Sequence, residues 1–113
     1  MKAIRVFEYG RPPVLTEIPT PSIADDEVLV KVRSTAVNHL DIAEASGAAK
    51  ELFPIDLPWT PGHEFSGVVE RTGKNVTGFA SGDPVFGDST SRAYAECVMA
   101  KPTVIARTVE SIL

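Results

Sequence analysis

Prolines and glycines are spread so densely through this chain that they limit every helix and strand to a short run. Nine of the 113 residues are proline and eight are glycine. Proline lacks a backbone donor and glycine favours turns, so both tend to mark the ends of regular elements. The sequence therefore disfavours a helical bundle and favours short elements joined by many turns.

Between these breaks, apolar residues mostly alternate with polar ones, as in half-buried strands. Strands are expected at residues 2–7, 14–18, 27–37, 64–71, 93–99 and 104–106. Residues 38–46 have helical spacing instead, with Asn38 at or near the N-cap and Gly47 as the C-cap signal. The pattern predicts a mainly β fold, a partly closed antiparallel barrel with at least one short helix.

Composition and charge narrow the class of protein. The length suits one domain, and 43% hydrophobic with 23% charged residues is typical of a globular protein. A net charge of −4 gives no basic surface for nucleic acid or an anionic membrane. No apolar run approaches the roughly 20 residues of a membrane helix, and no secretory signal opens the chain. The single Cys97 forms no internal disulfide, which favours a reducing, cytoplasmic location.

The strongest motif surrounds His63. Residues 62–76 read Gly-His-Glu-x-x-Gly-x5-Gly-x-x-Val. A glycine inside a strand indicates a bulge or a close backbone approach, which is expected at Gly67. His63 and Glu64 are adjacent, so in an extended strand they point to opposite faces and do not form a metal-binding pair.

This segment resembles the signature of zinc-type alcohol dehydrogenases, within the medium-chain dehydrogenase/reductase superfamily. Other motifs similar to that family follow in the same order, namely Lys2-Ala3-Ile4, Tyr9-Gly10, Pro19-Thr20-Pro21, Glu27-Val28-Leu29-Val30-Lys31-Val32, Val37-Asn38-x-x-Asp41, Gly82-Asp83-x-Val85 and Ala93-Tyr94-Ala95-Glu96. The resemblance spans essentially the whole chain. It implies the GroES-like fold of the N-terminal catalytic domain, a partly open β-barrel.

The resembled family divides according to its metal. The catalytic zinc of these dehydrogenases takes two Cys and one His, and their structural zinc takes four Cys. Asn38 stands at the first catalytic Cys position, Leu40 replaces a proton-relaying hydroxyl, and only His63 of the ligand pattern remains. We therefore expect no metal. The alternative is an improvised site built from His39, His63, Cys97 and a carboxylate.

Asn38-x-x-Asp41 instead resembles the zinc-independent quinone oxidoreductase branch, in which NADPH gives a hydride to a quinone or an enone. The resemblance implies that Asn38 is a catalytic and cofactor-binding residue, orienting the nicotinamide or donating a hydrogen bond to a developing oxyanion. Asp41 is the second catalytic candidate. Phe53 is the candidate for the substrate cleft.

Each candidate also has a purely structural interpretation. Asn38 can simply cap the helix, and Asp41 is favoured by the helix dipole in the first turn. His63 is expected to be a structural histidine satisfied by backbone groups. Arg92 is expected to be a solvated surface residue, and Cys97 to pack as a small apolar side chain.

No Gly-x-Gly-x-x-Gly loop occurs to bind a pyrophosphate. In the resembled family that loop belongs to a separate Rossmann domain. We therefore interpret residues 1–113 as the GroES-like catalytic domain without its cofactor domain, inactive alone, with an exposed apolar cleft wall and little affinity for NADPH. The complete enzyme is expected to take a small carbonyl or quinone substrate, and its family relatives often form homo-oligomers. The alternatives are a stand-alone GroES-like binding or oligomerisation module and a fragment of a zinc-type alcohol dehydrogenase.

Overall fold

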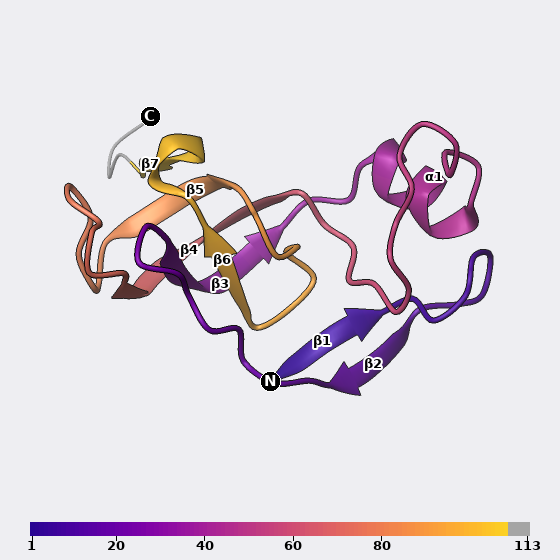
Figure 1. The fold of residues 1–113 in the computed structure, drawn as a ribbon, viewed down its shortest axis with the longest axis horizontal. Coiled ribbons are helices and arrows are strands. Elements are labelled where there is room, and N and C mark those ends of the chain that lie inside the picture. Colours follow the sequence, from indigo (N-terminus) through magenta and orange to yellow (C-terminus); the bar gives the residue numbers. More distant parts are fainter. Residues whose placement is uncertain (109–113) are drawn as a thin grey trace.

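The strands of the computed structural model, which describes residues 1–108, form two antiparallel sheets (Figure 1). The smaller sheet pairs β1 (Lys2–Arg5) with β2 (Val14–Glu17). The larger has the strand order β6-β3-β4-β5-β7 and comprises β3 (Val28–Thr35), β4 (Glu64–Thr72), β5 (Pro84–Asp88), β6 (Cys97–Ala100) and β7 (Ile105–Arg107). One α-helix, α1 (His39–Ser46), and a short 3-10 helix, η1 (Pro102–Val104), complete the described elements.

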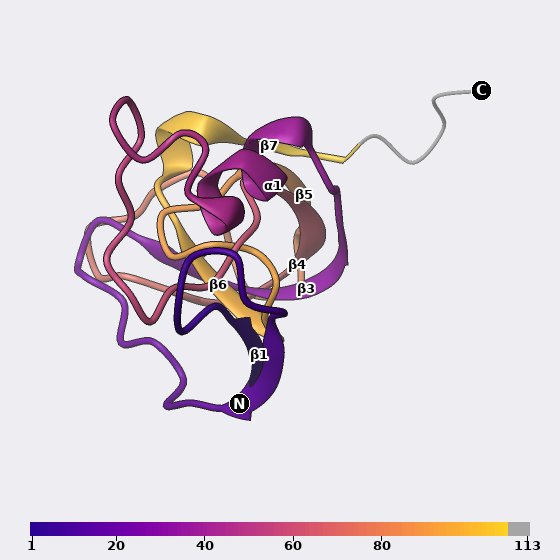
Figure 2. The ribbon, with the colours of Figure 1, turned by 90° about the vertical axis from the view of Figure 1, so that its right-hand side faces the viewer.

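The larger sheet curls without closing on itself (Figure 2), and its concave side holds an apolar core. Alternation along β3 places Val28 and Val30 at 0% exposure in this core, while Lys31 and Arg33 are exposed. The buried residues around Val28 and Val30 come from each of the four remaining strands of the sheet and from one loop. They are Phe65, Val69, Val85, Ala93, Val98, Ala100 and Ile105. The arrangement confirms the predicted fold, a mainly β, partly open barrel of GroES-like type with short helices.

Gly67 allows the two central strands to approach closely. It pairs with Val32 on β3 and Val85 on β5, and a Cβ at this position would collide with the carbonyl of Lys31. The β3–β4 register is irregular between Val32 and Ser34. The close backbone approach expected from the sequence is therefore present.

The strand expected at 93–99 begins later than predicted. Only Cys97–Ala100 joins the larger sheet, beside β3. Ala93 donates its N–H to Gly62 and Tyr94 donates to Pro61, so this stretch is bound to the segment before β4. Alternation alone could not reveal this change of partner, because both partners give the same apolar spacing. Pro84–Asp88, which was not among the expected strands, also forms a strand, β5.

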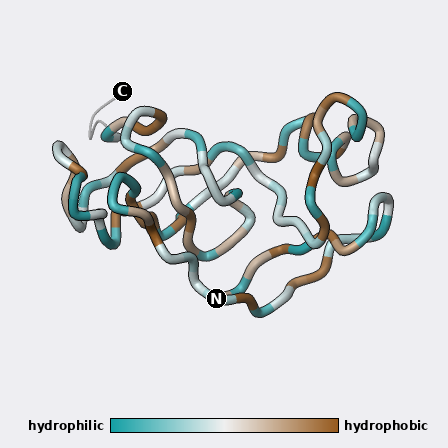
Figure 3. The backbone as a smooth tube through the Cα atoms, in the orientation of Figure 1, coloured by the Kyte–Doolittle hydropathy of each residue, from teal (hydrophilic) through white to brown (hydrophobic). Residues whose placement is uncertain are grey.

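Helix α1 lies at the opposite end of the molecule from β5 and β7 (Figure 1). Asn38 is its N-cap, and Gly47 ends it in the left-handed region at φ +86°, so the predicted helix is confirmed. The long connection to β4 is anchored by Trp59, which is 7% exposed and exchanges two backbone hydrogen bonds with Val6. Hydrophobic stretches continue into α1 and the connection after it, outside the larger sheet (Figure 3).

Candidate functional site

Helix α1 turns two carboxylates toward the interior of the protein. Asp41 and Glu44 are three residues apart, so they share one face of the helix, and each is only 3% exposed. The helix thus buries acidic residues while Ile42 stays 59% exposed. Two buried carboxylates require polar or cationic partners nearby.

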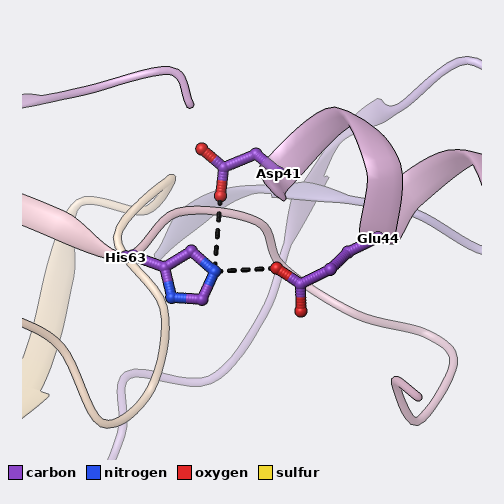
Figure 4. A group of neighbouring side chains, drawn as sticks. All are labelled: Asp41, Glu44 and His63. Atoms are coloured by element: carbon purple, nitrogen blue, oxygen red, sulfur yellow. Dashed lines mark hydrogen bonds and ion pairs between the residues drawn. The ribbon is translucent and has the colours of Figure 1, made fainter. Parts of the chain in front are cut away.

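His63, just before β4, supplies one such partner (Figure 4). Its Nε2 lies 2.7 Å from Glu44 Oε1 and 3.7 Å from Asp41 Oδ1. Asp41 Oδ1 has no hydrogen-bond partner although it is buried. The other oxygen, Oδ2, accepts the backbone N–H of Asn38 at 2.9 Å, which joins the helix cap to this group. We call Asp41, Glu44 and His63 the polar cluster.

Arg92 adds a permanent positive charge to the polar cluster. Its Nη1 lies 2.8 Å from His63 Nδ1 and 3.4 Å from Nε2, and its Nη2 lies 4.0 Å from Glu44 Oε2. The guanidinium also sits 5.9 Å from the ring centroid of Trp59, within range of a cation–π contact. Arg92 has φ +79°, a conformation that residues other than glycine seldom adopt. Its side chain is therefore held in place from several directions.

Because a guanidinium only donates hydrogen bonds, its short contact with His63 Nδ1 requires that nitrogen to accept. The neutral tautomer with the proton on Nε2 satisfies this contact and also lets Nε2–H donate to Glu44. One tautomer therefore accounts for both short distances.

Tyr94 connects the polar cluster to the protein surface. Its hydroxyl lies 3.3 Å from Asp41 Oδ2 and 3.3 Å from the carbonyl oxygen of Ala36. Burial and the nearby Asp41 carboxylate raise the pKa of Tyr94 to about 12. The phenol therefore stays protonated, as a hydrogen-bond donor, at neutral pH.

Asp41 and Tyr94, together with Arg11 and Ser46, form the polar part of a groove of about 420 Å³. The rest of its lining is mostly apolar and includes Val37, Ile42, Ala45 and three prolines. Val37 is 71% exposed, so this wall faces solvent in the described chain. The groove is suited to an apolar molecule that presents one or two polar atoms.

The structure separates the predicted site residues into two groups. Asn38 and Asp41 are in direct contact, and Asp41 lines the groove. Phe53 is 50% exposed on the connection after α1 and does not line this groove.

Two structural interpretations need correction. The ring nitrogens of His63 contact side chains rather than the expected backbone groups, because α1 brings Glu44 to one nitrogen and the 88–93 loop brings Arg92 to the other. Arg92 is not a free surface residue, since its contacts with His63 and Trp59 leave its side chain 31% exposed.

Sequence reasoning did not identify Glu44, Arg92 or Tyr94 as site residues. The three-residue spacing of Asp41 and Glu44 was an available signal, since it places both on one helical face. Arg92 had no such signal, because it meets His63 across 29 residues of sequence.

The residues present do not fit the zinc site of the alcohol dehydrogenases. Cys97 lies on β6 with its Sγ 3.7 Å from Glu70 Oε2, and His39 is exposed. Within residues 1–108, the one group of potential metal ligands is Asp41, Glu44 and His63, with ligand atoms within 4.8 Å of one another. This set has no thiolate, and the guanidinium of Arg92 lies against it, 2.8 Å from His63 Nδ1 and 4.0 Å from Glu44 Oε2.

Comparison with known proteins assigns the family. The model of the alcohol dehydrogenase GroES-like domain matches residues 24–108. The chain belongs to this family. Human quinone oxidoreductase is 39% identical to this chain over 116 aligned residues, covering 99% of the chain and 35% of the human protein.

Solved structures agree with this assignment. The quinone oxidoreductase of Coxiella burnetii superposes with a TM-score of 0.89 at 34% identity, covering 97% of this chain and 37% of that one. A mycobacterial protein in complex with NADPH also superposes at 0.89, with 32% identity, covering 100% of this chain and 35% of that one. This GroES-like chain therefore spans about a third of the length of the relatives it matches. Among the described residues, no helix is long and apolar enough to cross a membrane.

Proposed function

We propose that this GroES-like domain forms the substrate side of a zinc-independent, NADPH-dependent reductase of quinones or enones in the cytoplasm. One observation carries the proposal: Asn38 and Asp41, which match the quinone oxidoreductase pattern, meet beside an apolar groove. A flat, apolar acceptor with one or two carbonyl oxygens suits such a groove.

The proposal divides the chemistry between cofactor and domain. Bound NADPH supplies the hydride, and it is expected to be held mainly by a nucleotide-binding domain of the Rossmann type. The amide of Asn38 orients the nicotinamide or donates a hydrogen bond to the substrate oxygen as negative charge develops there. Asp41 positions Asn38 by accepting its backbone N–H. Phe53 stays a prediction for the cleft, as an exposed aromatic that an ordered substrate can cover.

Zinc independence is part of the proposal because of the donor set. An Asn amide replaces a thiolate, and Cys97 lies on β6, away from the polar cluster. A quinone is electron-poor already, so its reduction does not require a Lewis acid. Metal analysis of purified protein is expected to find much less than one zinc per chain.

A chimera tests the activity. This chain would replace the matching N-terminal third of human quinone oxidoreductase, and NADPH oxidation would be followed with a quinone as acceptor. We expect turnover, and we expect Asn38→Ala to lower kcat/KM roughly a hundredfold, the effect of losing one oxyanion donor. Asn75→Ala, at an exposed asparagine, is the matched control and should change little.

Two results would contradict the proposal. One is a folded chimera that binds NADPH but reduces neither a quinone nor an enone. The other is micromolar binding of NADPH by the 113-residue chain alone, which would contradict the division of labour between two domains.

A further inference from the structure

The polar cluster has most of the features of a divalent-cation site. Asp41 and Glu44 come from one face of α1 and His63 from the start of β4, and their ligand atoms lie within 4.8 Å of one another. Asp41 is 3% exposed, and its Oδ1 points toward His63 Nε2 without a hydrogen-bond partner. Nitrogen and oxygen donors of this kind bind Zn²⁺ and Co²⁺ in many proteins. A buried, unpartnered carboxylate oxygen is the feature that a cation would satisfy.

Arg92 lies close enough to the polar cluster to disfavour the binding of such a cation. Its guanidinium contacts His63 at 2.8 Å and approaches Glu44 to 4.0 Å. A metal on Nε2 would require the ring proton to move to Nδ1, which faces the Arg92 donor. The positive charge of Arg92 would also repel the incoming ion. Both effects disfavour metal binding as long as Arg92 holds its place.

We propose that Arg92 acts as a built-in cation that excludes divalent metal from the site formed by Asp41, Glu44 and His63. It partly neutralises the two buried carboxylates and keeps Nε2 of His63 protonated, as a donor to Glu44. Removing the guanidinium leaves two carboxylates, a free imidazole nitrogen and the unpartnered Oδ1. The result is a site for Zn²⁺ or Co²⁺. This inference gives a physical basis for the zinc-free part of the proposed function and rests on that part alone.

The test compares Zn²⁺ affinities of the full chain by competition with a chromogenic chelator. Arg92→Met should bind one Zn²⁺ at least tenfold more tightly than the unmodified chain, while Arg71→Met, at an exposed arginine, should not change the affinity. Adding His63→Gln to Arg92→Met should abolish the gain. Co²⁺ provides a second measurement, because its absorption bands report four- or five-fold coordination by nitrogen and oxygen.

A second variant guards against misfolding. Arg92→Gly also removes the guanidinium, and glycine suits the left-handed backbone at this position. A gain of affinity in either folded variant, lost with His63→Gln, supports the proposal. An unchanged affinity in folded Arg92→Met or Arg92→Gly overturns it, and so does a gain that survives His63→Gln.

The same measurements separate this inference from the proposed function. If neither the unmodified chain nor the variants bind zinc, Arg92 excludes nothing, but the zinc-free reductase is unaffected. If the unmodified chain binds one Zn²⁺ tightly, both the exclusion by Arg92 and the zinc independence are wrong. The chimera assay of quinone reduction depends on neither result.

Discussion

The two ends of this molecule bury opposite kinds of side chain: the larger sheet buries apolar residues, and helix α1 buries carboxylates. At the sheet end, side chains such as Val30 and Val85 are removed completely from water and need no specific partner. At the helix end, α1 buries Asp41 and Glu44, whose Oδ2 and Oε1 depend on Asn38 and His63, while Asp41 Oδ1 has no hydrogen-bond partner. Apolar packing tolerates many sequences, whereas a buried polar group tolerates few. This difference indicates that the functional residues are at the helix end, where each buried polar group needs a specific partner.

The largest expected effect is on the apolar end. Phe65→Ala should lower the free energy of unfolding by about 3–5 kcal/mol, because the side chain is 4% exposed in the core. Phe86→Ala, on the neighbouring strand β5 but 50% exposed, is the matched control and should cost much less. Urea denaturation measures both. Equal losses would mean that the two faces of the sheet are not distinct.

Removing His63 tests the polar end. His63→Ala should lower the free energy of unfolding by about 1–3 kcal/mol, because the buried Glu44 then loses the Nε2 donor that lies 2.7 Å from its Oε1. In a double-mutant cycle with Glu44→Gln, the two losses should be non-additive by at least about 0.5 kcal/mol. Simple additivity would show that the 2.7 Å contact contributes nothing to stability.

Tyr94 links the polar end to pH. Its pKa in the folded protein, about 12, is above the ordinary value of 10.0 because of burial and the Asp41 carboxylate. A raised pKa means that the folded state holds the proton more tightly, so this contribution is complete below pH 10 and is lost as the pH rises toward 12. Denaturation at increasing pH should show this loss, and Tyr94→Phe should remove it. Phenolate absorbance should show Tyr94 ionising earlier in Asp41→Asn.

The smallest effect is expected at an exposed ion pair. Lys101 Nζ lies 3.1 Å from Asp26 Oδ2, and the hydrogen bond and charge of Lys101 lower the pKa of Asp26. Any stabilisation is present above the ordinary pKa of Asp26 and lost as the pH falls, but solvent and salt screen it. Lys101→Gln should leave the unfolding free energy unchanged within error, while NMR titration should show Asp26 protonating at higher pH. A clear loss of stability would contradict this expectation, because it would show that an exposed ion pair stabilises the fold as much as the buried polar cluster does.

The apolar end was also the more predictable one. Alternation in 27–37 correctly predicted the strand that became β3, and Asn38 and Gly47 correctly marked the ends of α1. These signals are local, since each depends on the period of a strand or the chemistry of a helix end.

The polar cluster depends instead on contacts between distant segments. Glu44 reaches His63 across 19 residues, and Arg92 reaches it across 29. Neither separation carries a periodic signal. From the sequence we expected backbone groups to bind the His63 ring and solvent to surround Arg92, and both predictions were wrong. The family motif drew attention to Asn38 and Asp41, but it did not reveal the charge balance around them.

The reversed polarity of α1 has a thermodynamic consequence. Local opening of this helix exposes carboxylates and little apolar surface, because Ile42 already faces solvent. Its opening should therefore have a small heat-capacity change, in contrast to the large change on unfolding of the sheet. In hydrogen exchange, the amides of α1 should show a flatter temperature dependence and a stronger salt dependence than those of β3 and β4. The helix end can thus open locally as ionic strength rises while the larger sheet stays folded.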